Sequence, residues 1–293
     1  MQSKILPIFF MIIWVSSCRK EPISIQNPTP LSVDSVVFPD SLSFAGEPFD
    51  LNREDIKMAL RQDLVKNSFY HSNMVLLIQK SSRVFPIIEN ILKQENVPND
   101  FKYLAAIESN LDPKISSPVG AKGYWQFLPD TAKEYGLIVN EEIDQRSDLE
   151  ASTKAACKFL KYLKQQTGSW TLAAAAYNTG LGNIQKVLLE QKADTNTSYF
   201  DLKLNEETGR YLYRIGAIKQ ILSHPEMYGF SAEKLEKRHK LKHKWVTSPL
   251  HWVDFAREYK ISFAQLCYYN PWIVSPEYTA KENTRLKVYL PKD

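Results

Sequence analysis

Residues 98–136 constrain the fold most, because they contain a helix start, a helix stop and a carboxyl group on the apolar side. Pro98 suits the first position of a helix and Asp100 its first turn. The helix is therefore predicted to run from there until Pro113 prevents its continuation. At helical spacing, one stripe of this helix carries Phe101, Leu104, Ala105 and Glu108.

The stripe places Glu108 near the end of the helix, on the face that should turn inward. Desolvation on an apolar face and the negative end of the helix dipole both favour the protonated carboxyl, so both raise its pKa. A proton donor at neutral pH needs such a pKa. The alternative is that Glu108 lies at a frayed helix end and reaches water, as most glutamates do.

A turn-rich loop follows this helix and leads into a cluster of aromatic and amide side chains. Gly120 and Gly123 permit backbone conformations and close approaches that other residues cannot adopt. Tyr124, Trp125, Gln126 and Phe127 then occur together. Aromatic faces and amide hydrogen bonds suit a saccharide-binding wall, although an ordinary core turn with inward aromatic rings stays possible for Trp125 and Phe127.

An ordered series of residues resembles the soluble-lytic-transglycosylase-type catalytic domain, which has a goose-lysozyme-like helical fold, and within it the membrane-bound lytic murein transglycosylases. The resemblance covers about residues 50 to 225 and is specific because the whole series occurs in order. The series comprises Glu108-Ser109, Gly120-Ala121, Gly123, Trp125-Gln126, Pro129, Thr131-Ala132, Gly136, Asp144, Arg146, Asp148, residues 175–180, Glu207-Thr208 and Tyr211.

The resemblance implies an enzyme that cleaves the β-1,4 bond between N-acetylmuramic acid and N-acetylglucosamine in peptidoglycan and leaves 1,6-anhydromuramoyl ends. Glu108 would act first as acid and then as base. Hydrolytic glycosidases need two carboxylates, and only one persuasive candidate occurs here. The substrate-binding residues that the resemblance implies are Ser109, Gly123, Gln126, Tyr177, Asn178 and Glu207.

Several alternatives stay open beside this interpretation. Tyr177 can also be a core tyrosine with a satisfied hydroxyl. Asp144, Arg146 and Asp148 are interpreted as a structural charge and capping cluster rather than as catalytic residues. A lysozyme-like hydrolase and a non-catalytic peptidoglycan-binding lipoprotein are the alternative functions. No metal cluster or nucleotide loop in the sequence suggests a cofactor.

The first 18 residues are predicted to be a lipoprotein signal peptide. Lys4 precedes a short apolar run from Ile5 to Val15, and Val15-Ser16-Ser17-Cys18 resembles the bacterial lipobox. Lipidation of Cys18 would tether the chain to a membrane, with the outer membrane facing the periplasm as the expected place. A plain signal peptide is the alternative. Residues 19–49, rich in proline and serine, are predicted to be a linker.

Residues 50–230 are predicted to be a helical catalytic domain whose first helices, within 52–96, brace the catalytic helix. Ser147 and Glu150 match a capping box for a helix that Gly168 closes. The alanine-rich segment 170–178 should form a tightly packed helix, and a further helix is expected at 206–223. With 44% hydrophobic residues the chain can form a sizeable core, and its net charge of +4 does not mark a nucleic-acid binder.

Residues 244–293 are predicted to form a small α+β module after a basic hinge at 231–243. The expected order is a strand at 244–247, helices at 249–259 and 262–268, and a strand at 285–290. This order is similar to that of a LysM glycan-binding module. The usual Gly-Asp-Thr turn after the first strand is replaced by Thr247-Ser248-Pro249, so glycan binding and a purely structural role both stay open. The predicted fold class is thus mainly α, with a lysozyme-like domain followed by a LysM-like module.

Overall fold

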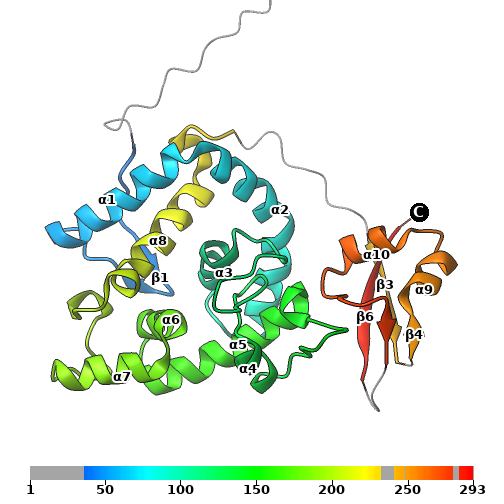
Figure 1. Ribbon diagram of the computed structural model, residues 1–293. Coiled ribbons are helices and arrows are strands. Elements are labelled where there is room, and N and C mark those ends of the chain that lie inside the picture. Colours follow the sequence, from blue (N-terminus) through cyan, green and yellow to red (C-terminus); the bar gives the residue numbers. More distant parts are fainter. Residues whose placement is uncertain (1–35, 232–240, 248, 280–283, 293) are drawn as a thin grey trace, which may run out of the picture. The chain divides into compact units, whose positions relative to one another are not determined.

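The computed structural model describes residues 36–231, 241–247, 249–279 and 284–292 and is mostly helical (Figure 1). The helices are α1 (Glu54–Phe69), α2 (His71–Gln94), α3 (Phe101–Ser109), α4 (Pro129–Glu134), α5 (Leu149–Thr167), α6 (Trp170–Thr179), α7 (Leu181–Glu190), α8 (Glu206–Ser223), α9 (Trp252–Glu258) and α10 (Phe263–Tyr269). The strands are β1 (Ser43–Phe44), β2 (Glu47–Pro48), β3 (Leu241–Val246), β4 (Leu250–His251), β5 (Glu277–Tyr278) and β6 (Leu286–Pro291).

Helix α3 is the central element of the larger domain and packs against α2 and α8 (Figure 1). Residues 101–106 are all buried; five of them are apolar or aromatic, and the sixth, Lys102, forms an ion pair with Glu89 at 2.6 Å. The helix ends where Asn110 adopts a left-handed conformation, with φ of 49°, which is a common way for a helix to stop. The helix is shorter than predicted at both ends, but Glu108 lies in its last turn as predicted.

Helix α6 packs tightly against α5 and α8. Residues 171–176 are all buried, and four of them are alanines, whose small side chains let neighbouring helices approach closely. Asn178 and Gly180 follow at the carboxyl end of this helix. The prediction of a tightly packed alanine-rich helix is therefore confirmed.

The start of α5 differs from the predicted capping box by one residue. Asp148 is the N-cap, and its side chain accepts a hydrogen bond from the Ala151 N–H. The hydroxyl of Ser147 instead donates to the carbonyl of Pro113 at 2.6 Å. The helix ends at Gly168, as predicted, with φ of 85°.

Residues 36–49 are part of the domain core rather than a linker, so this part of the predicted linker is wrong. Leu42, Phe44 and Phe49 are 7%, 0% and 4% exposed, and they pack in the main core. The short antiparallel strands β1 and β2 are joined at Ala45 and Gly46, which both have positive φ. The predicted signal peptide with Cys18, and residues 19–35 of the predicted linker, lie outside the described residues.

This hairpin is hydrogen-bonded to two helices of the catalytic domain. The Ala45 N–H donates to the carboxylate of Asp100 at 2.8 Å, just before α3. The carboxylate of Glu47 accepts from the N–H groups of Trp170 at 2.6 Å and Thr171 at 3.2 Å, at the start of α6. A carboxylate at a helix N-terminus satisfies unpaired amide groups and suits the helix dipole.

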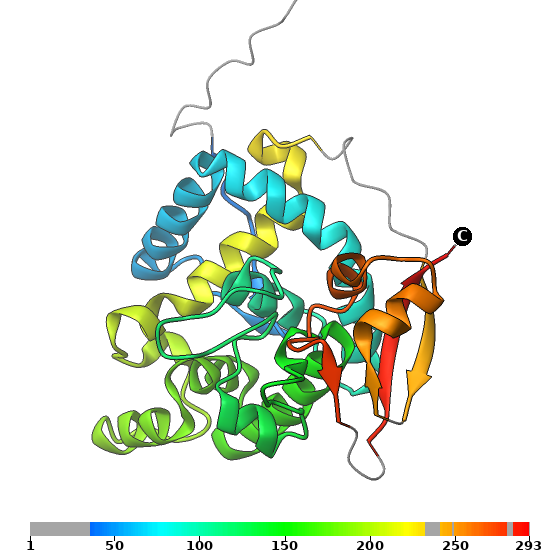
Figure 2. The same cartoon turned by 45° about the vertical axis from the view of Figure 1, so that its right-hand side comes forward.

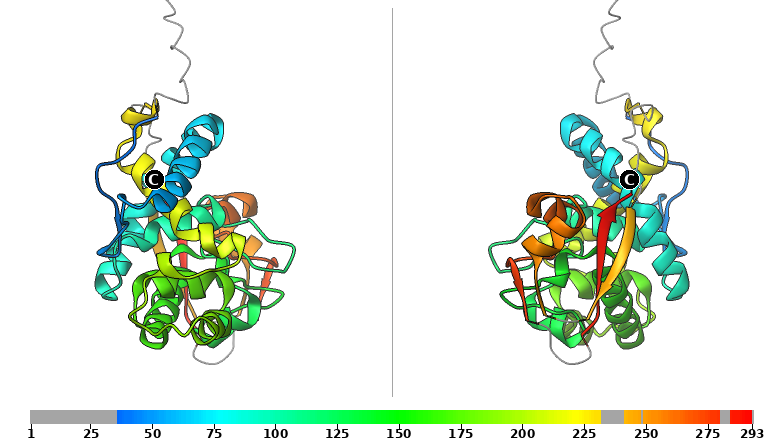
Figure 3. Two further views of the ribbon diagram at one scale, coloured as in Figure 1. Left: turned by 90° about the vertical axis from the view of Figure 1, so that its left-hand side faces the viewer. Right: turned by 90° about the vertical axis from the view of Figure 1, so that its right-hand side faces the viewer.

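The carboxyl-terminal module has the predicted strand, two helices and strand in that order. It also has the short paired strands β4 and β5, which were not predicted, and β4 occupies the start of the segment predicted as a helix from residue 249. Strands β3 and β6 pair antiparallel, with Trp245 opposite Lys287 (Figure 3, where they are orange and red). Helix α10 packs against β6 and α9, and α9 packs against β4 (Figure 2, where this module is orange to red). The separate small core of this module includes Trp252, Leu266 and Val288. Strand β3 begins at Leu241, three residues before the predicted module boundary, and residues 232–240 of the predicted hinge lie outside the described residues.

Backbone hydrogen bonds join this module to the segment before α5. The Asp144 N–H donates to the Trp272 carbonyl and the Val274 N–H donates to the Glu142 carbonyl, both at 2.9 Å. Lys287 also donates to both carboxylate oxygens of Glu150, at 2.8 and 2.9 Å. In the part of the chain that the structure describes, no helix has the length and apolar character needed to cross a membrane.

Candidate active site

Glu108 is a half-buried carboxyl group between α3 and α8. The hydroxyl of Tyr211, which is 1% exposed and comes from α8, donates a short hydrogen bond to Oε1 of Glu108. Burial raises the pKa of Glu108; the Tyr211 hydroxyl and the charge of Arg214 lower it, and the charge of Glu207 raises it. The net shift is upward, so this carboxyl stays protonated at a pH where exposed glutamates ionise.

Tyr177 connects α6 to the loop between α3 and α4. Its hydroxyl donates to the Trp125 carbonyl at 2.6 Å, and its ring packs against those of Phe127 and Phe159. Trp125 itself is fully buried and donates from Nε1 to Thr153 at 3.0 Å. Burial and the nearby charge of Glu108 raise the pKa of Tyr177 well above its ordinary value. Tyr177 is therefore a neutral hydrogen-bond donor that holds the loop close to Glu108.

Three of the predicted substrate-binding residues have structural contacts of their own. Ser109 is 1% exposed, and its hydroxyl lies 2.9 Å from the Tyr124 carbonyl, so it faces the protein interior rather than an open surface. Nε2 of Gln126 donates to the carbonyls of Ile115 at 3.1 Å and Gly123 at 3.0 Å. An ideal Cβ at Gly123 would lie 1.9 Å from the Arg146 carbonyl oxygen, so only glycine fits there. These residues shape the loop between α3 and α4.

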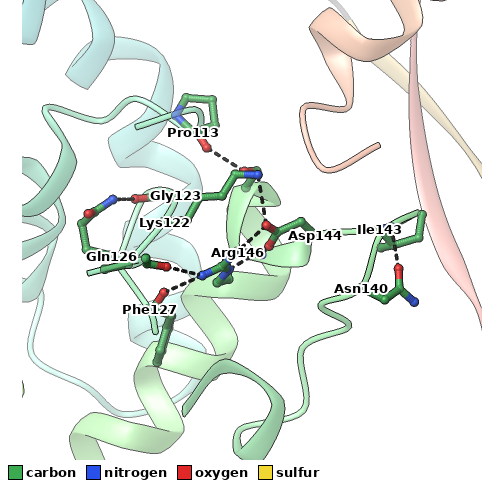
Figure 4. A network of polar contacts seen from close by, with 12 residues as sticks. Pro113, Lys122, Gly123, Gln126, Phe127, Asn140, Ile143, Asp144 and Arg146 are labelled. Carbon is green, nitrogen blue, oxygen red and sulfur yellow. Dashed lines mark hydrogen bonds and ion pairs between the residues drawn. The ribbon is translucent and has the colours of Figure 1, made fainter. Parts of the chain in front are cut away.

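A buried ion cluster fixes the same loop from the other side. Figure 4 shows the side chains of Lys122 and Arg146 directed toward Asp144. Arg146 donates to both Asp144 carboxylate oxygens at 2.9 Å, and Lys122 is 3.0 Å from the same group. Arg146 also donates to the carbonyls of Gly120 at 2.8 Å and Phe127 at 3.1 Å. Burial raises the pKa of Asp144, but the hydrogen bonds from Arg146 and Lys122 outweigh it and the net pKa is lowered.

Asp144, Arg146 and Asp148 thus make the ion-pair and capping contacts that the structural interpretation expects. Asp144 and Arg146 tie together the two ends of the glycine loop. Asp148 caps α5, and its carboxylate accepts from the Ala151 N–H at 2.9 Å.

Asn178 and Glu207 lie together, where the end of α6 meets the start of α8. Asn178 accepts a hydrogen bond from the Thr208 hydroxyl at 2.9 Å and donates to the Glu207 carboxylate at 3.4 Å. The charge of Glu207 acts on Glu108, so this pair borders the same site. Asn178 is partly buried and Glu207 is exposed.

A cavity of about 520 Å³ adjoins this site. Five charged residues line it, namely Lys66, Glu206, Glu207, Arg210 and Arg214.

Tyr211 and Arg214, which act on Glu108 as described above, were not among the predicted site residues. Glu207, Tyr211 and Arg214 are spaced at i, i+4 and i+7 on α8, so they share one helix face. That spacing is the signal that would have indicated the two missed residues.

Two segments of the chain match known protein families. Residues 85–200 match the Transglycosylase SLT domain, and residues 244–293 match the Soluble lytic transglycosylase C-terminal LysM-like domain. The chain carries an SLT transglycosylase domain. Glu108, Tyr177 and Asn178 lie inside the matched SLT segment, whereas Glu207 and Tyr211 follow it.

The SLT-domain chain is also similar to longer proteins. Membrane-bound lytic murein transglycosylase D of Escherichia coli (strain K12) is 30% identical over 212 residues, which are 72% of this chain and 46% of that protein. Membrane-bound lytic murein transglycosylase F of Saccharophagus degradans is 29% identical over 172 residues, which are 51% of this chain and 33% of that protein. The chain thus spans less than half the length of these relatives.

A solved structure is similar as well. The crystal structure of the 70 kDa soluble lytic transglycosylase from Escherichia coli aligns with 22% identity and a TM-score of 0.40, covering 53% of this chain and 26% of that chain.

Proposed function

We propose that this protein is a peptidoglycan lytic transglycosylase that cleaves the β-1,4 bond between N-acetylmuramic acid and N-acetylglucosamine and leaves 1,6-anhydromuramoyl ends. The observation that carries the proposal is the half-buried Glu108 carboxyl, whose pKa is raised by burial beside a cavity lined by polar groups. The SLT domain and the similarity to lytic murein transglycosylases support the substrate class.

The proposed reaction uses Glu108 twice. Its carboxyl proton passes to the glycosidic oxygen as the bond from that oxygen to C1 of the muramoyl residue breaks. The 6-hydroxyl of the same muramoyl residue then attacks C1, and the Glu108 carboxylate takes the hydroxyl proton. No water is consumed, and the carboxyl ends in the protonation state in which it began.

Tyr211 assists both steps in this scheme. After the first proton transfer Glu108 is an anion in a largely desolvated place, and the Tyr211 hydroxyl donates to it. Glu207 is the other carboxylate whose charge acts on Glu108, and its hydrogen bond with Asn178 places it at the border of the site. Its charge keeps the Glu108 proton in place until substrate binds.

Replacing the proton donor tests the proposal. Glu108→Gln keeps the shape of the side chain but cannot transfer a proton, so release of soluble muropeptides from purified sacculi is expected to fall by about 10²- to 10⁴-fold. Circular dichroism of the variant provides the control for folding. Undiminished turnover by a folded Glu108→Gln protein would refute the role of this residue.

Two other functions predict different products. A lysozyme-like hydrolase adds water, so mass spectrometry of its products would show reducing ends in place of anhydro ends. A non-catalytic binding protein would bind sacculi and release no soluble muropeptides. The presence of Glu108 with its donor Tyr211 favours the enzyme, because a glycan clamp does not need a proton donor.

The site of action is proposed from the amino-terminal sequence. Lipidation of Cys18 would anchor the protein in the cell envelope, with the outer membrane facing the periplasm as the expected place, and two relatives are named as membrane-bound. A Cys18→Ser variant is expected to lose incorporation of labelled fatty acid and to leave the membrane fraction. Retention of the label by this variant would disprove the anchor.

A further inference from the structure

Two cationic side chains beside the active site make no ion pair within the described part of the chain, although the charge of the buried Asp63 acts on both of them. Lys66, in the last turn of α1, is exposed, and Arg214, on α8, is partly buried. In the described ranges neither side-chain nitrogen group makes an ion pair or a hydrogen bond. Arg210, which lies one turn before Arg214, differs because it forms an ion pair with the buried Asp63 at 2.6 Å.

Lys66 and Arg214 both line two neighbouring cavities. The larger, of about 520 Å³, also contains the acidic side chains of Glu206 and Glu207. The smaller, of about 190 Å³, has no acidic residue in its lining. Its other walls are Asn67, Tyr70, Asn73, Ala106, Ile107, Asn110 and Ile218.

The smaller cavity therefore has the composition of a carboxylate site. Two cations supply the charge, the amide of Asn73 and the hydroxyl of Tyr70 are neutral hydrogen-bonding groups, and no acid in the lining competes. Tyr70 is 59% exposed, so the site is open to a bulky ligand. Arg214 also lies close enough to Glu108 for its charge to act on that carboxyl, so a ligand bound here is near the reacting bond.

We propose that Lys66 and Arg214 bind a free carboxylate of the peptide carried by the muramoyl residue of the substrate. This assignment rests on the proposed function. In peptidoglycan the peptide branches from the muramoyl residue, whose C1 is the reacting atom, and it ends in free carboxylates. The cationic cavity beside Glu108 thus selects glycan strands that still carry their peptides.

Lys66 is the better residue to change, because Arg214 also affects Glu108 directly. We expect Lys66→Glu to raise KM roughly three- to tenfold on glycan strands that carry peptides with free carboxylates, with kcat unchanged. On strands whose peptide carboxylates have been amidated, Lys66→Glu and the unchanged protein are expected to have the same KM. Lys66→Gln should give a smaller rise, because it removes the charge without reversing it.

Lys57 provides the matched control. It is an exposed lysine of the same helix, nine residues earlier, which places it on the opposite side of α1. Lys57→Glu makes the same change in net charge and is expected to leave KM unchanged on both substrates. Equal effects of the two substitutions would mean that only overall charge matters and would overturn the site.

The remaining outcomes are also decisive. An equal rise in KM on amidated strands would overturn the role of the peptide carboxylate. Tighter binding of strands stripped of peptide would assign the cations to the lactyl carboxylate that stripping exposes.

Binding is measured in parallel in the Glu108→Gln background, by fluorescence anisotropy with labelled soluble strands. If the unchanged protein cleaves no strand, the proposed function fails, and the difference between free and amidated strands in this binding assay still tests the carboxylate site.

Discussion

Burial and three polar neighbours each shift the pKa of the Glu108 carboxyl in a known direction. The Tyr211 hydroxyl and the Arg214 charge favour the ionised carboxyl, whereas burial and Glu207 favour the protonated one. The pKa of Glu108 is raised because burial dominates. Each neighbour can be removed separately, so the pH dependence of catalysis can be changed in either direction.

Substitutions at Tyr211 and Glu207 are expected to move the pH profile in opposite directions. Tyr211→Phe removes a donor to the carboxylate, so the pKa of Glu108 rises and the basic limb of kcat/KM moves to higher pH. Glu207→Gln removes a like charge, so that pKa falls and the limb moves to lower pH. Profiles of both variants on soluble glycan strands check the signs, and a shift in the same direction would contradict this assignment of causes.

Glu108 is also expected to destabilise the folded protein at neutral and alkaline pH. Its folded-state pKa is raised above the value of the unfolded chain, so its contribution to stability is present below the unfolded pKa and is lost as pH rises through the folded pKa. Glu108→Gln should therefore increase Tm at pH 8 relative to the unchanged protein, and the gain should shrink toward pH 4. Differential scanning calorimetry at the two pH values measures this, and a Tm gain independent of pH would contradict it.

The position of Glu108 in the last turn of a buried helix could be predicted from the sequence, because the spacing of one helix places it on an apolar stripe. Tyr211 was part of the resemblance but not of the predicted site, and Arg214 was in neither. Both belong to a helix about one hundred residues later, and only the packing of α3 against α8 brings them to Glu108. The buried position of Ser109 depends instead on the loop after α3, whose Tyr124 carbonyl accepts a hydrogen bond from the Ser109 hydroxyl.

At the scale of elements, the second half of the loop between α3 and α4 is held at four backbone carbonyls. Arg146 binds the carbonyls of Gly120 and Phe127, Tyr177 binds that of Trp125, and Ser109 that of Tyr124. These contacts come from three different elements, so the loop has one conformation without regular secondary structure of its own. Rigid support of this kind keeps the wall of a site within hydrogen-bonding distance of a substrate.

Gly123 and Gly120 give a matched test of this arrangement. Both have positive φ, of 81° and 83°, but a Cβ at Gly123 would lie 1.9 Å from the Arg146 carbonyl oxygen, whereas nothing lies within 4 Å of one at Gly120. Gly123→Ala is expected to cost about 3 kcal/mol through the clash and the strained backbone together. Gly120→Ala should cost about 1 kcal/mol, from the backbone alone. Urea denaturation measures both, and equal losses would show that the close approach to Arg146 is not rigid.

The elements themselves could be predicted to differing degrees. Helices with strong periodicity or an alanine-rich core, such as α6, were found, and Gly168 marked the end of α5. The N-cap of α5 was placed one residue early because Ser147 and Asp148 are both good caps, and only the contact of Ser147 with Pro113 decides between them. The strands β1 and β2 have two residues each, too few to show an alternating pattern.

At the scale of the whole described structure, side chains join the two cores in addition to backbone hydrogen bonds. Lys287 of β6 donates to both oxygens of Glu150 on α5, and Thr279 donates to the carboxylate of Glu142. Burial raises the pKa of Glu150, but the hydrogen bonds from Lys287 and Tyr289 outweigh it and the net pKa is lowered. The order of the two folded parts was predicted from the sequence, whereas these contacts were not, because they join residues more than one hundred positions apart.

A double-mutant cycle on Glu150→Gln and Lys287→Met tests this ion pair. Their side chains are 30% and 25% exposed, so the pair is only partly screened by water and a coupling free energy of about 1 kcal/mol is expected. Because the lowered pKa of Glu150 gives stability that is lost as pH falls through that pKa, the coupling should be smaller at pH 3 than at pH 7. Chemical denaturation at pH 7 and pH 3 provides the four free energies, and additive effects at pH 7 would show that the pair contributes nothing.

The hairpin of β1 and β2 before α1 determines where a truncated expression clone of the catalytic part can begin. A fragment starting at Asp50 looks reasonable on the printed sequence, yet it would discard Phe44 and Phe49 from the apolar interior. It would also leave the first amides of α6 without the carboxylate of Glu47. Expression clones of the catalytic part should therefore begin no later than Val36, the first residue that the structure describes.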